Sequence, residues 1–150
     1  MSAEQFMDAA LEQAQRALDA DEVPIGAVLV IDGAIVARGY NQPIAACDPT
    51  AHAEMLVLRD AAHAVGNYRL TTADVYVTLE PCLMCVGALV HARVRSVVYG
   101  AEEPKTGALV SAIRALDTAG LNHRFNVVAG VRQEAARELI QEFFRKKRRL

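Results

Sequence analysis

Two short segments, residues 51–54 and 80–85, constrain the fold of this chain more than any other feature. The first reads Ala-His-Ala-Glu and the second reads Glu-Pro-Cys-Leu-Met-Cys. Together they supply one imidazole, two thiols and a spare carboxylate, from His52, Cys82, Cys85 and Glu54. A catalytic zinc ion keeps one coordination position open for water, whereas a structural ion is usually closed by four protein ligands. Three ligands and a non-ligand acid therefore predict one zinc ion per chain, with an activated water and Glu54 as its proton carrier.

The spacing of these residues dictates how the chain must fold around them. His52 and Cys82 each fall at the expected start of a helix, where the positive end of the helix dipole favours thiolate over thiol. The thirty residues between them require the fold to bring two helix starts to one edge of a sheet, where open α/β sheets place their sites. A Cys-x-x-Cys pair alone could also be a redox pair or half of a structural zinc site. A lone histidine on an apolar helix could also be a hydrogen-bonded core residue. The joint pattern favours the catalytic interpretation.

Length and composition indicate one soluble unit. At 150 residues the chain predicts a single domain over 1–150, large enough to bury a substantial core. No apolar run approaches the roughly 20 residues that a membrane span needs, and residues 1–5 lack the pattern of a secretory signal. Three cysteines, two of them in Cys-x-x-Cys, do not make a disulfide framework and indicate a reducing compartment. We therefore expect a cytoplasmic protein without membrane contact.

The charge of the chain is distributed unevenly. Residues 145–149 read Arg-Lys-Lys-Arg-Arg and hold five of the sixteen basic groups, so the rest of the chain is net acidic. A basic tail on an acidic body points to a polyanionic partner. The last turn of any helix also favours cations, so a solvated helix end would explain the tail without a partner.

Apolar periodicity and turn signals predict the elements of the fold. Ser2 and Gln5 resemble a capping box that opens the first helix, Thr50 is expected to cap the second, and Asp32-Gly33 predicts a hairpin. The expected helices cover residues 3–18, 51–65, 82–91, 110–116 and 132 onward, and the expected strands cover 25–31, 34–40, 74–79, 96–99 and 126–129. Residues 82–91 are apolar on nearly every face, which predicts burial in the core or against another subunit. One hairpin followed by strand–helix alternation predicts an α/β fold of three layers, α/β/α, around a mixed five-stranded sheet.

The chain resembles the bacterial tRNA-specific adenosine deaminases, of the cytidine/deoxycytidylate deaminase superfamily, over nearly its whole length. His-x-Glu followed by Pro-Cys-x-x-Cys is the established signature of zinc-dependent nucleobase deaminases. Three motifs that occur widely among deaminases are Val-Pro-Ile-Gly-Ala-Val at 23–28, Asp-Pro-Thr-Ala-His-Ala-Glu at 48–54 and Tyr-Val-Thr-Leu-Glu-Pro-Cys-Leu-Met-Cys at 76–85. Three that narrow the match to the tRNA branch are Lys-Thr-Gly-Ala at 105–108, Asn-His-Arg at 122–124 and Phe-Phe-Arg at 143–145.

The resemblance implies a cytidine-deaminase-like fold, a homodimer and hydrolytic conversion of adenosine to inosine at the wobble position of a tRNA anticodon. It also implies that His52, Cys82 and Cys85 hold zinc while Glu54 shuttles protons. Candidate contacts to the anticodon loop are Asn41, the main-chain N–H of Ala53, Glu103, Lys105, Arg124, Phe144 and Arg145. The chain departs from the family at Glu103, where aspartate is common, and at Cys47, where another polar residue is frequent.

Two other functions fit parts of the pattern. A free nucleobase or nucleoside deaminase acting on cytosine, cytidine or guanine would use the same zinc site, and the basic tail and the Lys-Thr-Gly-Ala motif argue against it. A zinc-stabilised nucleic-acid-binding module without catalysis would leave Glu54 unexplained and would lack a fourth ligand unless Cys47 served.

Overall fold

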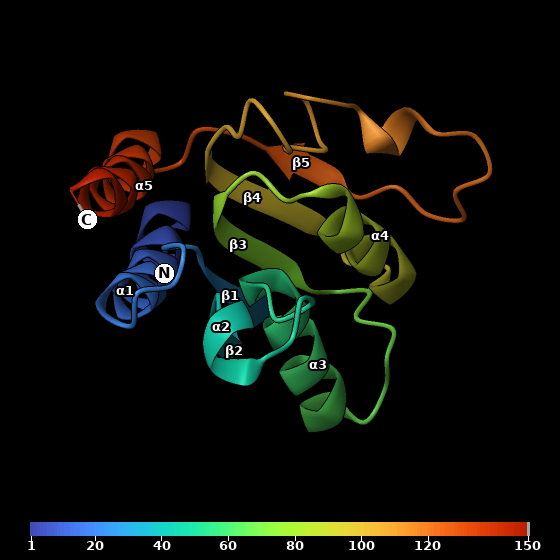
Figure 1. The fold of residues 1–150 in the computed structure, drawn as a ribbon. Coiled ribbons are helices and arrows are strands. Elements are labelled where there is room, and N and C mark those ends of the chain that lie inside the picture. The colour runs from blue at the N-terminus through green and yellow to red at the C-terminus, as the bar shows by residue number, and fades with distance from the viewer. Residues whose placement is uncertain (150) are drawn as a thin grey trace.

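Five strands form one mixed sheet in the computed structural model, which describes residues 1–149 (Figure 1). Their order across the sheet is β2-β1-β3-β4-β5. They are β1 (Gly26–Ile31), β2 (Ala34–Tyr40), β3 (Asp74–Leu79), β4 (Ser96–Ala101) and β5 (Asn126–Val128). β1 pairs antiparallel with both β2 and β3, whereas β3, β4 and β5 run parallel to one another. The predicted α/β class with an antiparallel hairpin and parallel strands is confirmed.

Helices cover both faces of this sheet (Figure 1). α1 (Ala3–Asp19) and α5 (Gln133–Arg148) pack on one face, and α3 (Ala53–Val65) and α4 (Leu83–Ala92) pack on the other. A four-residue helix, α2 (Pro43–Ala46), and a 3-10 turn, η1 (Ala115–Asp117), interrupt the connecting loops. Within residues 1–149, no helix combines the length and the apolar character that crossing a membrane requires.

The first helix begins and packs as its sequence predicts. The Ser2 N–H donates to Oε1 of Gln5 at 2.8 Å and the Gln5 N–H donates to Oγ of Ser2 at 3.2 Å, which completes the capping box. α1 then comes so close to the sheet that a Cβ at Gly26 would overlap the carbonyl oxygen of Ala10. Only glycine permits this approach of helix backbone to strand backbone.

Three local expectations are wrong, each because a distant or competing side chain takes the backbone groups. Thr50 does not cap α3, because its N–H and hydroxyl both donate to Asp48 at 2.8 Å, and α3 begins two residues after the expected start, at Ala53. Residues 41–50, where no helix or strand is expected, contain α2, because Pro43 suits the first helical position and the Glu22 carboxylate accepts the free N–H groups of the first turn.

The helix expected over residues 110–116 is absent, and the only helical turn near it is η1. The N–H groups of 109–111 donate to the carboxylate of Glu80, at 2.8–3.0 Å. The next two, of Ala112 and Ile113, both donate to the carbonyl oxygen of Gly107 at 2.9 and 3.2 Å, so the chain does not follow the helical pattern of bonds to the residue four positions earlier. A tertiary contact therefore overrides the local apolar spacing.

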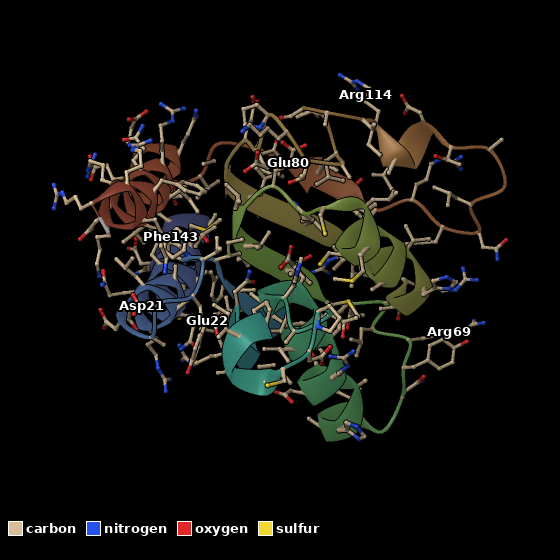
Figure 2. The ribbon with its side chains drawn as sticks, in the orientation of Figure 1. Asp21, Glu22, Arg69, Glu80, Arg114 and Phe143 are labelled. Carbon is tan, nitrogen blue, oxygen red and sulfur yellow. The ribbon has the colours of Figure 1, made fainter. Side chains whose placement is uncertain are left out.

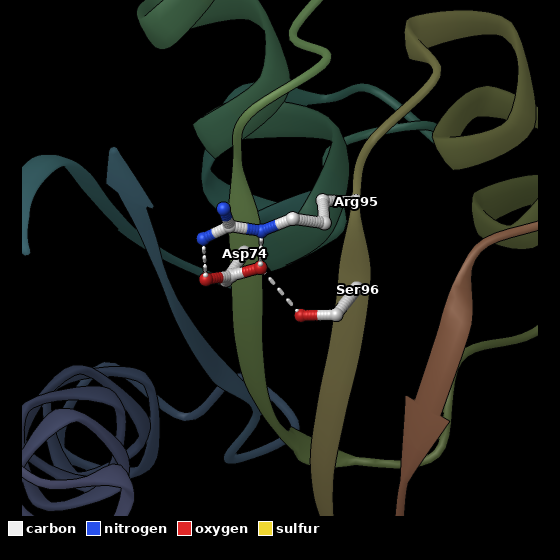
Figure 3. Close-up of polar contacts among 3 residues, drawn as sticks. All are labelled: Asp74, Arg95 and Ser96. Atoms are coloured by element: carbon white, nitrogen blue, oxygen red, sulfur yellow. Dashed lines mark hydrogen bonds and ion pairs between the residues drawn. The ribbon is translucent and has the colours of Figure 1, made fainter. Parts of the chain in front are cut away.

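An ion pair fixes the start of the two central parallel strands (Figure 3). The Asp74 carboxylate, at the first residue of β3, accepts hydrogen bonds from Arg95 at 2.6 and 3.0 Å and from the Ser96 hydroxyl at 2.6 Å. Partial burial raises the pKa of Asp74, but the hydrogen bonds from Arg95 and Ser96 outweigh it and hold this pKa below its ordinary value. The cluster sets the register of β4 against β3, where Asp74 pairs with Ser96.

Candidate metal centre

The starts of α3 and α4 meet beyond the end of β3 and bring three ligand-type side chains together. His52 is the N-cap of α3 and Cys82 is the N-cap of α4, and both have extended backbone conformations that turn the chain into the helix. Cys85 lies one turn further along α4 and is fully buried. The ligand atoms of His52, Cys82 and Cys85 all lie within 4.8 Å of one another. The fold thus joins two segments thirty residues apart, as their spacing requires.

The distances in this cluster suit a single zinc ion. Nδ1 of His52 lies 3.7 Å from Sγ of Cys82 and 3.6 Å from Sγ of Cys85. With zinc–sulfur distances of about 2.3 Å, zinc–nitrogen distances of about 2.0 Å and tetrahedral angles, a ligand sulfur and nitrogen lie about 3.5 Å apart. Two thiols and one imidazole form a donor set typical of zinc, and among residues 1–149 no fourth His, Cys, Asp or Glu joins them.

The electrostatics of the two thiols favour a bound cation. A hydrogen bond from the Cys85 thiol, together with the contact to His52, lowers the pKa of Cys82 to about 4 despite partial burial. The same hydrogen bond to Cys82, with burial, raises the pKa of Cys85. The pair therefore holds one thiolate at neutral pH without metal, and a cation is the group that would release the second proton.

Glu54 is a buried acid that does not belong to the ligand cluster. It lies in the first turn of α3 and is 3% exposed, and its Oε1 accepts no hydrogen bond from any group within residues 1–149. Burial raises the pKa of Glu54 to about 7, because the ionised form is poorly solvated there. A carboxyl group with this pKa can both accept and release a proton near neutrality.

Two of the predicted substrate contacts, Asn41 and Ala53, lie against the cluster and bind each other. Oδ1 of Asn41 accepts the main-chain N–H of Ala53 at 2.8 Å. This bond joins the end of β2 to the start of α3, so it fixes Asn41 next to His52. Because the Ala53 N–H is already donated to Asn41, the amide nitrogen of Asn41 is the group that remains for a substrate.

A second group of predicted contacts meets in one pocket at the C-terminal half of α5. Lys105, Phe144 and Arg145 line this pocket of about 600 Å³, although about forty residues separate the first from the other two. Its remaining lining residues are Ile140, Gln141 and Arg148. Glu103 lies beside Lys105 in the chain, and its carboxylate accepts the Lys105 N–H at 2.9 Å. An aromatic ring with three cations around it is a typical surface for nucleotides and phosphates.

Arg124 does not join this group. Its guanidinium donates to the carbonyl oxygens of Leu116 at 2.7 Å and Thr118 at 2.9 Å, so it organises the loop between η1 and β5. Two further acids had no predicted role. Glu22 and Glu80 are buried carboxylates that bind main-chain N–H groups. The signal available was a charged residue close to an apolar strand, since Glu80 directly follows β3 and Glu22 lies four residues before β1.

One family and several known proteins resemble this chain. The family of MafB19-like deaminases matches residues 1–148. The tRNA-specific adenosine deaminase of Agrobacterium fabrum is 47% identical over 143 residues, which are 95% of this chain and 94% of that protein. A solved structure from work on A-to-I editing by tRNA:A34 deaminases at the wobble position of transfer RNA is 46% identical, with a TM-score of 0.88 over 90% of this chain and 98% of that chain. The guanine deaminase of Bacillus subtilis is 36% identical, with a TM-score of 0.65 over 75% of this chain and 83% of that chain.

Proposed function

Because the chain belongs to the MafB19-like deaminases and to the tRNA-specific adenosine deaminases, we propose that it converts adenosine to inosine at the wobble position of a tRNA anticodon. Residues 1–150 act as one zinc-dependent deaminase domain, in the cytoplasm, where its tRNA substrate is found. The observation that carries the proposal is the cluster of His52, Cys82 and Cys85 with a buried, unligated Glu54 beside it.

The chemistry follows from the roles of these side chains. His52, Cys82 and Cys85 would hold one zinc ion as its three protein ligands. When bound, zinc supplies a nucleophile for C6 of adenine by lowering the pKa of a water ligand towards about 7. Glu54 would take a proton from the attacking water and deliver it to N1 of the base. It would then take the second proton from the new hydroxyl at C6 and pass it to the amino group, which leaves as ammonia. The anticodon loop already presents unpaired bases, which reduces the cost of extracting one from its stack.

The basic pocket favours a polynucleotide over a free base. Lys105, Arg145 and Arg148 surround Phe144 in a pocket separate from the ligand cluster, so a substrate that fills both must extend beyond one nucleoside. Asn41 sits at the cluster and its amide nitrogen is the candidate contact to the reacting nucleoside, whereas the N–H of Ala53 is taken up by Asn41. Lys105 lines the basic pocket, and the carboxylate of Glu103 accepts its main-chain N–H. Arg124 belongs to neither group, because its guanidinium is bound to the carbonyl oxygens of Leu116 and Thr118.

A parallel assay tests this function against its rivals. The purified protein with zinc would be incubated with an anticodon stem-loop bearing a 5′-ACG anticodon and, separately, with cytosine, cytidine and guanine. Inosine in the RNA is the expected result. Ammonia released only from a small molecule would identify a free-base or nucleoside deaminase, an alternative that the likeness to a guanine deaminase keeps open. Tight RNA binding without deamination would identify a binding module.

The enzyme is a homodimer in this proposal, and the apolar surface of α3 and α4 supports it. Leu83 is 60% exposed and Tyr68 is 64% exposed, and a groove of about 360 Å³ between the two helices is lined mainly by Met55, Leu58, Ala62, Tyr68, Ala88 and Ala92. Such a surface is typical of a subunit interface.

Leu83→Glu should shift the protein from dimer to monomer in light scattering, because the carboxylate would be buried without a partner. Ile113→Glu is the control, since Ile113 is a comparably large exposed side chain in the loop before η1. A wild-type protein that is monomeric at assay concentration would contradict the homodimer.

A further inference from the structure

Glu80 is a buried carboxylate beside the metal centre that the proposed mechanism leaves unused. It follows β3 directly, lies two residues before Cys82 and is 3% exposed. Among residues 1–149, no Lys or Arg forms a salt bridge with it. A buried charge is costly unless hydrogen bonds compensate for it, so its partners indicate its role. The three-ligand cluster does not include Glu80, which excludes a direct role at the metal.

All partners of the Glu80 carboxylate come from one segment, residues 103–111. They are the N–H groups of Glu103, Leu109, Val110 and Ser111, at 2.8–3.2 Å, and the hydroxyl of Ser111. Figure 2 labels Glu80 where the chain that follows β4 passes the end of β3. Because four of these five groups can only donate, an ionised carboxylate accepts from all of them and an amide does not.

Two further contacts press the same segment against the start of α4. The Ala108 N–H donates to the carbonyl oxygen of Pro81 at 2.8 Å. Gly107 lies so close that a Cβ there would overlap the carboxylate of Glu80. Glu80 and Pro81 immediately precede Cys82, so one short stretch of chain holds both a metal ligand and the 103–111 segment.

The 103–111 segment connects the metal centre to the basic pocket. Its Lys105 lines that pocket together with Phe144 and Arg145 of α5. The N–H of Lys105 donates to the carboxylate of Glu103, whose own N–H donates to Glu80. The position of Lys105 relative to Cys82 therefore depends on a chain of hydrogen bonds that begins at Glu80.

We propose that Glu80 is a positioning residue that fixes the separation between the reacting base and the phosphate contact at Lys105, and so sets the affinity for the anticodon loop. It does so without touching the substrate. This inference rests on the proposed function, because it assigns the pocket and the metal centre to one RNA substrate.

Glu80→Gln tests the proposal. The side-chain oxygen of the new glutamine would still accept from the three N–H groups of 109–111. The NH2 group of the glutamine would then face the N–H of Glu103, and because both groups are donors, the Glu103 end of the segment would be released. We expect the KM for the stem-loop to rise about tenfold, a typical effect of losing one hydrogen bond to a charged group. The kcat and the zinc content should stay within about twofold of the wild-type values, because the ligand cluster is intact. The Glu103 amide should also exchange faster with solvent, a change that is measured without substrate.

Asp74→Asn is the matched control. Asp74 lies at the opposite end of the same strand, where its carboxylate also accepts several hydrogen bonds (Figure 3). Asp74→Asn should lower the melting temperature about as much as Glu80→Gln does, and it should leave the KM unchanged. Gly107→Ala should raise the KM as Glu80→Gln does, because the added Cβ displaces the same carboxylate. The variant that combines Glu80→Gln and Gly107→Ala should lose less binding free energy than the sum of the losses in the two single variants.

The outcomes separate this inference from the proposed function. A wild-type protein that fails to deaminate the stem-loop contradicts the proposed function, and the exchange of the Glu103 amide still reports on the segment. An unchanged KM in Glu80→Gln, or a defect that its zinc content or kcat explains, overturns the positioning role. If Glu80→Gln does not fold, the KM of Gly107→Ala decides in the same way.

Discussion

Glu54→Gln should reduce the formation of inosine by at least about a thousandfold and leave one zinc ion bound per chain. General acid–base catalysis contributes typically 10²–10⁴-fold, and Glu54 is the only group assigned to all proton transfers in this site. Glutamine has nearly the same shape as glutamate, so the packing around the first turn of α3 is kept. Single-turnover assays with the stem-loop and a metal analysis of the same preparation measure the two quantities together.

Cys85→Ser is the companion variant for this experiment. It removes a proposed ligand from the cluster, so the zinc content should fall with the activity. The two variants therefore separate the acid from the ligands. A Glu54→Gln protein that has lost its metal would identify Glu54 as a ligand and contradict the assignment of an open coordination position.

Replacing all five cations of residues 145–149 with glutamine should weaken RNA binding about ten- to hundredfold at low salt. Each cation that contacts a phosphate releases counterions, and for single-stranded RNA each contact contributes about 0.7 to the slope of log affinity against log salt concentration. The slope should therefore fall by up to about 3.5 if all five cations contact phosphates. Glutamine preserves helix propensity, so α5 should persist to Arg148. Titrations of labelled stem-loop at several salt concentrations measure both quantities.

Arg137→Gln is the control for this tail variant. Arg137 lies on the same helix, but its guanidinium already pairs with Glu134 at 3.0 Å. Its replacement should leave the salt slope unchanged. An unaltered dissociation constant in the five-residue variant would show that the tail is a solvated helix end and not part of the RNA surface.

Signals that act within a few residues predicted most of the fold. The capping box at Ser2 and the Asp32-Gly33 hairpin both depend on near neighbours, and both are present. The first two ligand positions also follow from local rules, because His52 and Cys82 each occupy a helix N-cap. The distances within the cluster could not be derived from spacing, since they depend on how α3 and α4 pack.

The errors have one physical cause. Thr50, α2 and the segment 110–116 are each determined by a carboxylate that accepts main-chain N–H groups, and for the last two that carboxylate lies more than twenty residues away. Apolar periodicity and capping preferences describe only the chain within one or two turns. A buried acid that satisfies a loop from a distance leaves no periodic trace in the sequence, so Glu22 and Glu80 had no predicted role.

The arrangement of α1 and α5 has a practical consequence for building chimeric proteins. Both helices lie on the face of the sheet opposite α3 and α4, and Arg132 at the start of α5 is joined to Asp8 of α1 at 2.9 Å. Phe6, near the start of α1, packs against Tyr76 of β3 with the two rings tilted by 41°, so the chain enters the fold on the face of the sheet opposite α3 and α4. A second module grafted before Ser2 would extend away from the metal centre and from the basic pocket. The same module grafted after Arg149 would crowd the groove beside Lys105, which makes the front of the chain the better attachment point.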